Sequence, residues 1–340
     1  MIPHNIPAGC GSNICLRTEM LKRATASCLI LFCLSRVVHF SNGQGVDSSK
    51  AAEIRAVEFL KREVPAWSKN NGCYSCHNNG DAARALYKAT QKGHRLSTDV
   101  LAETTAWLSD PHLWDKNKGD PGFSDQRLAN LQFAVALLTA LETGHLIDKK
   151  PLQAAARKVA ADQSPSGAWL IDSGTAVGSP ATYGSILATM LACRVLKAAG
   201  LDAHRNATRG AEDWLNRAPV KSVSAAASLL LAGDHSSAAK SRRDECLTMI
   251  SRAQTKDGGW GPYADSPPEV FDTALVLLAL AAEKQSAIKD RIHRGRNFLA
   301  AQQDLDGGWP ATTRPPGGES YAQRLSTTGW ATLALLATRE

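Results

Sequence analysis

Residues Gln254–Trp260 read QTKDGGW, and residues Gln303–Trp309 read QDLDGGW. A looser copy, QSPSGAW, occupies Gln163–Trp169. In all three loops, 163–169, 254–260 and 303–309, a glutamine stands six residues before a tryptophan and a glycine stands two residues before it. Glycine permits the positive φ at which helices often end, and tryptophan supplies a large apolar face with one N–H donor. We therefore expect these loops to hold neighbouring copies of one structural unit together.

Each of these loops lies between two helical segments. The segments before them are amphipathic, and those after them are more uniformly apolar, so the unit is predicted to be an outer helix, a loop and an inner helix. The predicted outer helices are 151–161, 242–252 and 289–301, and the inner helices are 183–199, 270–283 and 326–338. Degenerate copies pair 51–63 with 81–91, 96–108 with 125–142, and 207–216 with 222–233. The apolar residues follow the helical period and no convincing strand is present, so the sequence predicts an all-α protein of six helix pairs.

The repeated loops carry a family resemblance. QTKDGGWG, QQDLDGGWP and the later STTGWATLALL (326–336) resemble the QW repeats of the squalene cyclase and prenyltransferase superfamily. The resemblance implies a single (α/α)6 toroid, a terpenoid cyclase-like barrel, over residues 46–340. It is strong in the last third of the chain and weak at its start.

The first predicted loop carries a different motif. Asn71–Gly80 reads NGCYSCHNNG and places Cys73, Cys76 and His77 in C-x-x-C-H spacing, the signature of covalent c-type haem attachment. Two thiols this close can add to the two vinyl groups of one porphyrin, and the adjacent histidine can ligate the iron. With eight cysteines and nine histidines in 340 residues, a chance match is expected on the order of 0.005 times per chain. We therefore expect haem c at this loop, and with it a similarity to exported bacterial proteins that join QW repeats to a cytochrome-c-type motif.

Other uses of the cysteines stay open. Cys73 and Cys76 could form a redox dithiol, a disulfide or half of a zinc site, although no second Cys/His pair at similar spacing follows in the sequence. Cys193 and Cys246 lie in apolar helical segments, where a free cysteine is usually a small buried hydrophobe, and a disulfide between them is the alternative.

The sixth iron ligand cannot be read from the sequence. An open position would allow redox catalysis on small molecules, whereas a filled one would favour electron transfer. The candidates are His94, His112, His145, Met190 and Met249, each of which is more often an ordinary surface or core residue. Trp67 and Tyr74 are expected to contact the haem.

A leader precedes the repeats. Ala24–Leu34 is an apolar run behind two basic residues, and a small polar segment follows it, which is the pattern of a signal peptide starting at Met20. Arg36 interrupts the apolar run too early for a comfortable membrane span, although a retained anchor is the alternative. We therefore expect residues 1–45 to be a leader and the protein to be exported, either periplasmic or membrane-associated.

The cyclase activity of the resembling family needs features that this sequence lacks. No D-x-D-D motif is present, and its nearest approach, 304–307, belongs to a QW-type loop. Aromatic residues make up only 6% of the chain, and no prenyltransferase-like zinc set surrounds Cys193 or Cys246. Asp272 enters the apolar run VFDTALVLLAL and could be a proton donor of raised pKa, but a helix-capping role is the simpler interpretation. Whether the protein is an enzyme therefore stays open.

These observations favour an exported c-type haem protein on a squalene cyclase-like toroid, acting in electron transfer or as a redox-coupled binding scaffold. The alternative is a terpenoid-processing or lipid-binding protein without haem. The expected partners are a redox protein and a hydrophobic small molecule or lipid in the central cavity. The net charge of +7 is scattered along helices without interleaved aromatics, so nucleic acid is not expected as a partner.

Overall fold

The computed structural model describes residues 48–117, 125–171, 177–233, 237–283, 286–314 and 317–339. The expected leader at 1–45 lies outside the described residues. Residues 45–340 form one compact unit, and within it the described residues form α-helices with three short helical turns and no strand. The all-α prediction is therefore confirmed.

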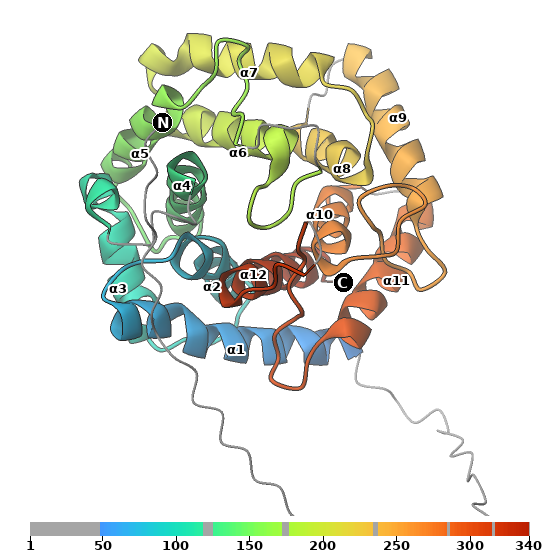
Figure 1. Cartoon of the computed structure of the whole chain (residues 1–340), viewed down its shortest axis with the longest axis horizontal. Helices are drawn as coiled ribbons and strands as arrows, with labels where there is room; N and C mark the ends of the chain where they lie inside the picture. Colours follow the sequence, from blue (N-terminus) through green and yellow to red (C-terminus); the bar gives the residue numbers. More distant parts are fainter. Residues whose placement is uncertain are drawn as a thin grey trace, which may run out of the picture. The chain divides into compact units, whose positions relative to one another are not determined.

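Outer and inner helices alternate along the chain and form two concentric rings (Figure 1). The outer ring contains α1 (Ser48–Asn71), α3 (Asp99–Leu108), α5 (Lys150–Ala161), α7 (Arg205–Arg217), α9 (Ser237–Ala253) and α11 (Ser286–Gln302). The inner ring contains α2 (Ala83–Gln91), α4 (Gln126–Glu142), α6 (Gly184–Ala199), α8 (Val223–Ala232), α10 (Val270–Leu280) and α12 (Tyr321–Ala337). Each inner helix contacts the next, and α12 returns to α2, so the six predicted pairs close into a toroid.

Side-chain chemistry explains which helices lie inside. Every residue of α4 from Leu128 to Ala140 is buried, because neighbouring helices cover it on all sides. By contrast, α7 buries only Ala211 and Leu215, as expected for an amphipathic helix on the outer surface. The uniform apolar composition of the inner helices therefore decides their place in the ring.

In each of the three QW-type loops, the glutamine side chain links its own repeat to the next one. Their glutamine side chains donate from Nε2 to the backbone carbonyl of the glycine four residues later, at 2.8 to 2.9 Å. The same amides donate to a carbonyl of the following outer helix: Ala207 in α7 at 2.8 Å, Arg291 in α11 at 3.0 Å and Ala52 in α1 at 2.8 Å. Each glutamine therefore joins two repeats.

The tryptophans of these loops are buried between the two helices of their own repeat. Trp169, Trp260 and Trp309 are at most 1% exposed. Their indole N–H groups donate to carbonyls of the preceding outer helix, Val159, Ile250 and Leu299, at 2.7 to 2.8 Å. Their backbone N–H groups donate to threonine hydroxyls of the following inner helix, Thr189, Thr273 and Thr328, at 2.9 to 3.0 Å. The tryptophans therefore join the two helices of one repeat, whereas packing between neighbouring repeats was expected.

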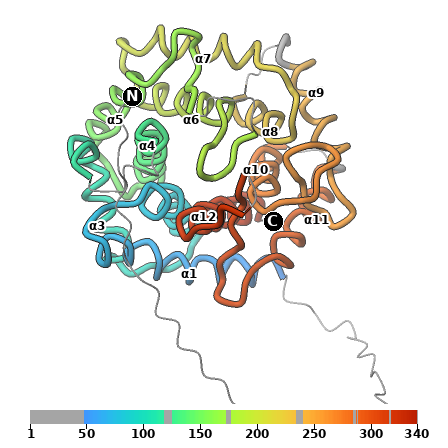
Figure 2. The backbone as a smooth tube through the Cα atoms, viewed as in Figure 1, coloured from blue at the N-terminus to red at the C-terminus, as the bar shows by residue number. Residues whose placement is uncertain are grey.

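The last repeat closes on the first through buried polar contacts, and the tube in Figure 2 shows α11 and α12 lying beside α1. The buried Arg296 of α11 donates to Ser49 Oγ at 2.8 Å and to the carbonyl of Leu335 at 2.8 Å. Glu53 of α1, fully buried, accepts from His94 at 2.7 Å and from Arg339. These contacts tie the two ends of the repeat array together.

Among the described residues, no helix combines the length and the hydropathy that a membrane crossing requires. The apolar run at Ala24–Leu34 lies outside that part of the chain.

Candidate functional site

The C-x-x-C-H motif lies between α1 and α2, at the end of the toroid where the inner helices begin. We expected a loop over 71–80, but the structure divides the motif. Cys73 lies in a bend, whereas Cys76 and His77 begin a π-helical turn, η1 (Cys76–Ala82), that leads directly into α2. Ser75 caps that turn, because its hydroxyl accepts from the backbone N–H of His77 at 3.2 Å. Cys73 and Cys76 are both free and half-buried.

A hydrogen-bonded chain fixes the ring of His77. Its Nδ1 lies 2.7 Å from Ser326 Oγ of α12, and Ser326 Oγ donates to Asp81 Oδ2 at 2.8 Å. Since the serine hydroxyl has one proton and gives it to the carboxylate, Nδ1 of His77 carries the ring proton and donates it to Ser326. Nε2 is then the unprotonated nitrogen, and it has no hydrogen-bond partner among the described residues.

Asp81 is the centre of this network. It is fully buried, and besides Ser326 it accepts from Gln132 Nε2 at 2.7 Å, from Arg84 Nη1 at 3.2 Å and from the Tyr183 hydroxyl. Four donors, from α2, α4, α12 and the residue before α6, therefore converge on two carboxylate oxygens.

Tyr183 reaches Asp81 from a strained backbone position. It precedes α6 with φ of 60°, and among the described residues it is the one non-glycine residue with positive φ. Such conformations cost on the order of 1–3 kcal/mol and persist where the surrounding structure enforces them. The bond between its hydroxyl and Asp81 gives a reason for this strain.

Burial controls the protonation of the motif. It lowers the pKa of His77 below its usual range, against the opposing effect of the Asp81 charge, so the imidazole is neutral near pH 7. Burial, followed by the Asp81 charge, raises the pKa of Cys76 to about 12. Cys76 is therefore a thiol rather than a reactive thiolate.

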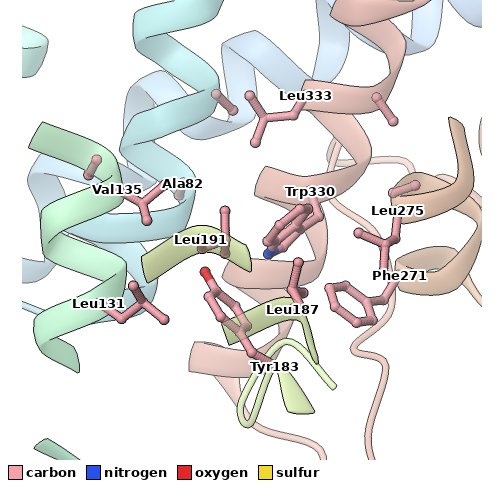
Figure 3. Packing of buried hydrophobic residues seen from close by; sticks show 14 of the residues in the cluster. Ala82, Leu131, Val135, Tyr183, Leu187, Leu191, Phe271, Leu275, Trp330 and Leu333 are labelled. Atoms are coloured by element: carbon pink, nitrogen blue, oxygen red, sulfur yellow. The ribbon is translucent and has the colours of Figure 1, made fainter. Parts of the chain in front are cut away.

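Aromatic side chains lie beside this network, and Figure 3 shows Tyr183, Trp330 and Phe271 close together among buried hydrophobic residues. Trp330 packs edge to face against Tyr183 and Phe271, with ring centroids 5.6 and 5.5 Å apart, and the Arg84 guanidinium lies 4.7 Å from the Trp330 ring centroid. All of these residues are buried. The polar cluster is thus enclosed on one side by π faces and a cation.

A second buried acid lies at the start of α10. The helix-capping role expected for Asp272 is not observed, because Glu269 occupies the N-cap position. Asp272 instead accepts from Ser224 of α8 and from Arg314, which also binds Glu269 at 2.9 Å. Burial raises the pKa of Asp272 to about 6, although Arg314 and Ser224 act in the opposite direction.

The structure sorts the candidate sixth ligands. His94 is bound to Glu53 and Arg339, and Arg339 lies at the opposite end of α12 from Ser326, about 20 Å away at a rise of about 1.5 Å per residue. His145 contacts Thr90 and Thr143, also near the far ends of inner helices. Met190 lines a separate cavity farther along α6, and Met249 lies on α9, in the outer ring.

His112 is the candidate on an element beside the motif. It lies on η2 (Pro111–Lys116) and is exposed. Asn117 is the next residue after η2. Its side chain accepts from the backbone N–H of Tyr74 at 2.9 Å and donates to the Tyr74 carbonyl at 2.6 Å.

The aromatic residues expected to contact haem have protein partners. Tyr74 stacks on Trp107 at 4.3 Å and donates to Glu103 at 2.9 Å, and Trp67 stacks on Tyr321 at 5.7 Å. Trp67 Nε1 and the nearby Asn78 Oδ1 are buried without a hydrogen-bond partner among the described residues. A donor and an acceptor next to the motif are thus unused by the protein itself.

Sequence reasoning missed the residues that join these clusters. Asp81, Arg84, Gln132 and Arg314 were not identified as site residues, although Tyr183 and Ser326 begin two of the predicted inner helices. A polar residue within the apolar run LANLQFAVALL, Gln132, was a usable signal. Nothing local indicated that it would meet Asp81.

The fold and this site define a terpenoid cyclase-like (α/α) toroid with a buried polar cluster where its inner helices begin. Residues 218–340 match the family of the squalene-hopene cyclase C-terminal domain. Comparison with curated protein sequences gave no significant match.

Solved structures share the architecture at low sequence identity. A variant of the type II terpene cyclase MstE from Scytonema, in complex with geranylgeranyl dihydroxybenzoate as substrate, is 13% identical with a TM-score of 0.55, over 85% of this chain and 97% of that chain. Another MstE variant, in complex with the product merosterolic acid A, is 13% identical with a TM-score of 0.56, over 86% of this chain and 97% of that chain. A protein from Actinoplanes is 16% identical with a TM-score of 0.55, over 85% of this chain and 99% of that chain. These structural similarities confirm the toroidal fold, and the family match covers residues 218–340.

Proposed function

We propose that this protein is an exported c-type haem protein on a squalene cyclase-like toroid, with haem c attached to Cys73 and Cys76 and ligated by His77. It would act in electron transfer or as a redox-coupled binding scaffold, at the periplasm or a membrane. The observation that carries the proposal is the C-x-x-C-H histidine whose Nδ1 is bound to Ser326, which leaves Nε2 for iron. Bound haem supplies an iron that takes up and releases one electron.

The surroundings of His77 suit an iron ligand. A ligating histidine normally donates its other ring N–H to an acceptor that fixes the tautomer and the ring orientation. Ser326 is that acceptor, and Asp81 polarises it from behind. A neutral imidazole is the ligating form, and burial favours it here.

The competing uses of the two cysteines receive less support. An attacking dithiol needs a lowered thiol pKa, whereas that of Cys76 is raised to about 12. The described part of the chain contains no group of three or more His, Cys, Asp or Glu side chains placed to hold a metal ion, so a zinc site gains no support.

Spectroscopy on purified protein tests the proposal. The chain would be exported in a host that has haem-attachment machinery, denatured, and measured as its pyridine haemochrome. We expect one covalent haem per chain, lost in the Cys73→Ala/Cys76→Ala double variant. The matched control, Cys193→Ala/Cys246→Ala, removes the other two described cysteines and is expected to keep the haem. Wild-type protein that exports and folds without covalent haem would reject the proposal.

The Ser326→Ala variant tests the positioning role separately. Both thioether bonds are expected to remain, because neither cysteine changes. The reduction potential is expected to rise, since His77 loses the polarised acceptor that strengthens it as a donor to iron. An unchanged potential in a correctly folded variant would remove Ser326 and Asp81 from the argument while leaving haem attachment standing.

A second candidate function is terpenoid processing in the toroid without haem. It is favoured by Asp272, whose pKa of about 6 would let it carry a proton at mildly acid pH, and by the buried aromatic group of Trp330, Tyr183 and Phe271, which could face a carbocation. Conversion of an all-trans polyene by the Cys73→Ala/Cys76→Ala variant, abolished by Asp272→Asn, would support this function over the haem proposal.

A further inference from the structure

A large cavity opens far from the motif, toward the carboxyl ends of the inner helices. Its volume is about 1290 Å³, and it lies between the two rings at α6, α7, α8, α9 and the end of α10. Leu229, Leu230 and Leu231 form one wall. These consecutive leucines are half-buried, whereas Leu187, Leu191 and Leu275 on the neighbouring inner helices are at most 2% exposed.

The cavity has a structural cause. Helix α8 has 10 residues and α10 beside it has 11, whereas α6 on its other side has 16. It stops at Ala232, so the carboxyl-terminal half of α6 lacks an equally long neighbour on that side. Met190 and Cys193 of α6 and Cys246 of α9 therefore face the cavity as its apolar floor. Cys193 and Cys246 are free in the structure, so the disulfide considered between them is not formed.

Most charges at the rim are already paired. Arg194 binds Glu142 at 2.6 Å, Lys197 binds Glu212 at 2.6 Å, and Arg243 binds Glu283. One acid at the rim, Asp213, is exposed, where water screens its charge.

Arg242 differs from these residues. It is half-buried, and its Nη2 donates only to backbone carbonyls, that of Leu215 at 3.1 Å and that of Ala218. Its Nε is buried without a partner among the described residues, and no carboxylate there pairs with it. Among the described basic residues that line the cavity, Arg242 is therefore the one without a carboxylate partner, and an anion bound there would pair with it.

We propose that this cavity binds a single-chain lipid with an anionic head group, whose head binds Arg242 and whose chain lies along Leu229–Leu231 and Met190. The volume exceeds that of ordinary small-molecule pockets and suits a flexible chain. The site lies at the opposite end of the inner helices from His77, so it does not depend on the haem. A carboxylate and a phosphate monoester share the recognised chemistry, and the experiment separates them.

Titration calorimetry on the purified protein tests this, with the two anionic probes kept below their micelle concentrations and the alcohol below its solubility limit. Laurate, dodecyl phosphate and 1-dodecanol carry the same chain with two anionic heads and one neutral head. We expect at least one anion to bind with one-to-one stoichiometry and about tenfold or more tighter than the alcohol, because hydrogen bonds to charged groups are the strong ones. The tighter of the two anions identifies the head group.

Variants locate the site. Leu230→Glu places a like charge on the half-buried leucine wall and is expected to weaken the anion about tenfold or more. Arg242→Gln is expected to reduce the preference for anion over alcohol. Arg252→Gln, an exposed arginine on the same helix outside the cavity, is the matched control and is expected to change nothing. Equal affinity for anion and alcohol, or unchanged affinity in folded Leu230→Glu protein, overturns the proposal.

Discussion

At the scale of single residues, the QW-type loops act through three side-chain choices. Glutamine bridges two repeats, tryptophan fills the space within one repeat, and glycine lets the next outer helix approach. At Gly307, φ is 98° and an added Cβ would lie 2.5 Å from the backbone oxygen of Arg55. The spacing of these residues in the sequence predicted the loops, but their backbone partners in the next repeat were visible only in the structure.

The contribution of a bridging glutamine can be measured at Gln303. Its Nε2 donates to Gly307 and Ala52, so Gln303→Ala leaves two carbonyls without this donor and breaks the link between the last and first repeats. We expect a loss of about 1–3 kcal/mol in the free energy of unfolding, measured with urea. Gln302→Ala changes the exposed neighbour and is expected to stay within about 0.5 kcal/mol of wild type. Equal effects in the two variants would contradict the bridging role.

Close approach at Gly307 gives a second test. Gly307→Ala combines backbone strain with a clash against α1, and we expect a cost of about 2–4 kcal/mol. Gly317→Ala is the matched control, since Gly317 has φ of 91° but nothing within 4 Å of an added Cβ. That variant is expected to lose only about 1 kcal/mol, from strain alone. Similar losses in urea unfolding of the two variants would mean that the contact with Arg55 is unimportant.

At the scale of elements, helical periodicity located both helices of all six pairs, including the shortened pair α7 and α8. Two features departed from that pattern. The π-helical turn Cys76–Ala82 replaced a loop, because Ser75 and Asn79 satisfy the backbone around it. The carboxyl group of Asp272 binds Ser224 on α8 and Arg314 on the loop before α12, whereas a capping contact within α10 was expected. In both cases, hydrogen bonds that ordinary helical periodicity does not encode decided the outcome.

The buried Asp272 predicts a pH dependence of stability. The pKa of Asp272 is about 6 in the folded protein, against an ordinary value of 3.8 for an aspartate in water. The folded state therefore binds this proton more tightly than the unfolded state. The stabilisation from the proton is therefore present below about pH 4 and lost as pH rises through about 6, a change on the order of 3 kcal/mol. Asp272→Asn removes the titrating group. The difference in free energy of unfolding between this variant and wild type is therefore expected to change across this pH range.

Urea unfolding at intervals between pH 4 and pH 7 measures that difference. Asp265→Asn, an exposed acid in the preceding loop, is the control and is expected to give a constant difference from wild type. A constant difference for Asp272→Asn as well would mean that Arg314 keeps Asp272 ionised throughout.

At the scale of the whole molecule, closure of the ring defines the protein. Arg339 binds Glu53, so the end of the last repeat lies against the first helix of the array. The same closure brings Ser326 to Asp81, 245 residues away along the chain. The candidate site is therefore a product of ring closure as well as of the local motif.

Circular permutation tests which connections the ring needs. In one permutant, a short linker joins residue 339 to residue 48, and the new ends lie between Asp148 and Lys149. This position is in the exposed connection from α4 to α5, which contains no QW-type loop. We expect this protein to unfold cooperatively near the wild-type melting temperature. New ends between Lys256 and Asp257, equally exposed, divide a QW-type loop and are expected to lower the melting temperature by several degrees, about 2–4 °C per kcal/mol lost. Equal melting temperatures in the two permutants would show that the QW-type loop stabilises the ring even when its backbone is cut.

The sequence by itself determined the paired helices, the positions of the QW-type loops and the C-x-x-C-H motif. These are local properties: apolar period, glycine conformation, tryptophan packing and thiol spacing each depend on neighbouring residues. The tertiary structure alone decided that Asp81, Gln132, Tyr183 and Ser326 meet behind His77, and that a short α8 leaves a cavity beside Arg242. The physical reason is that a closed ring juxtaposes side chains from distant repeats. Their meeting depends on helix lengths and on closure, which local periodicity does not encode.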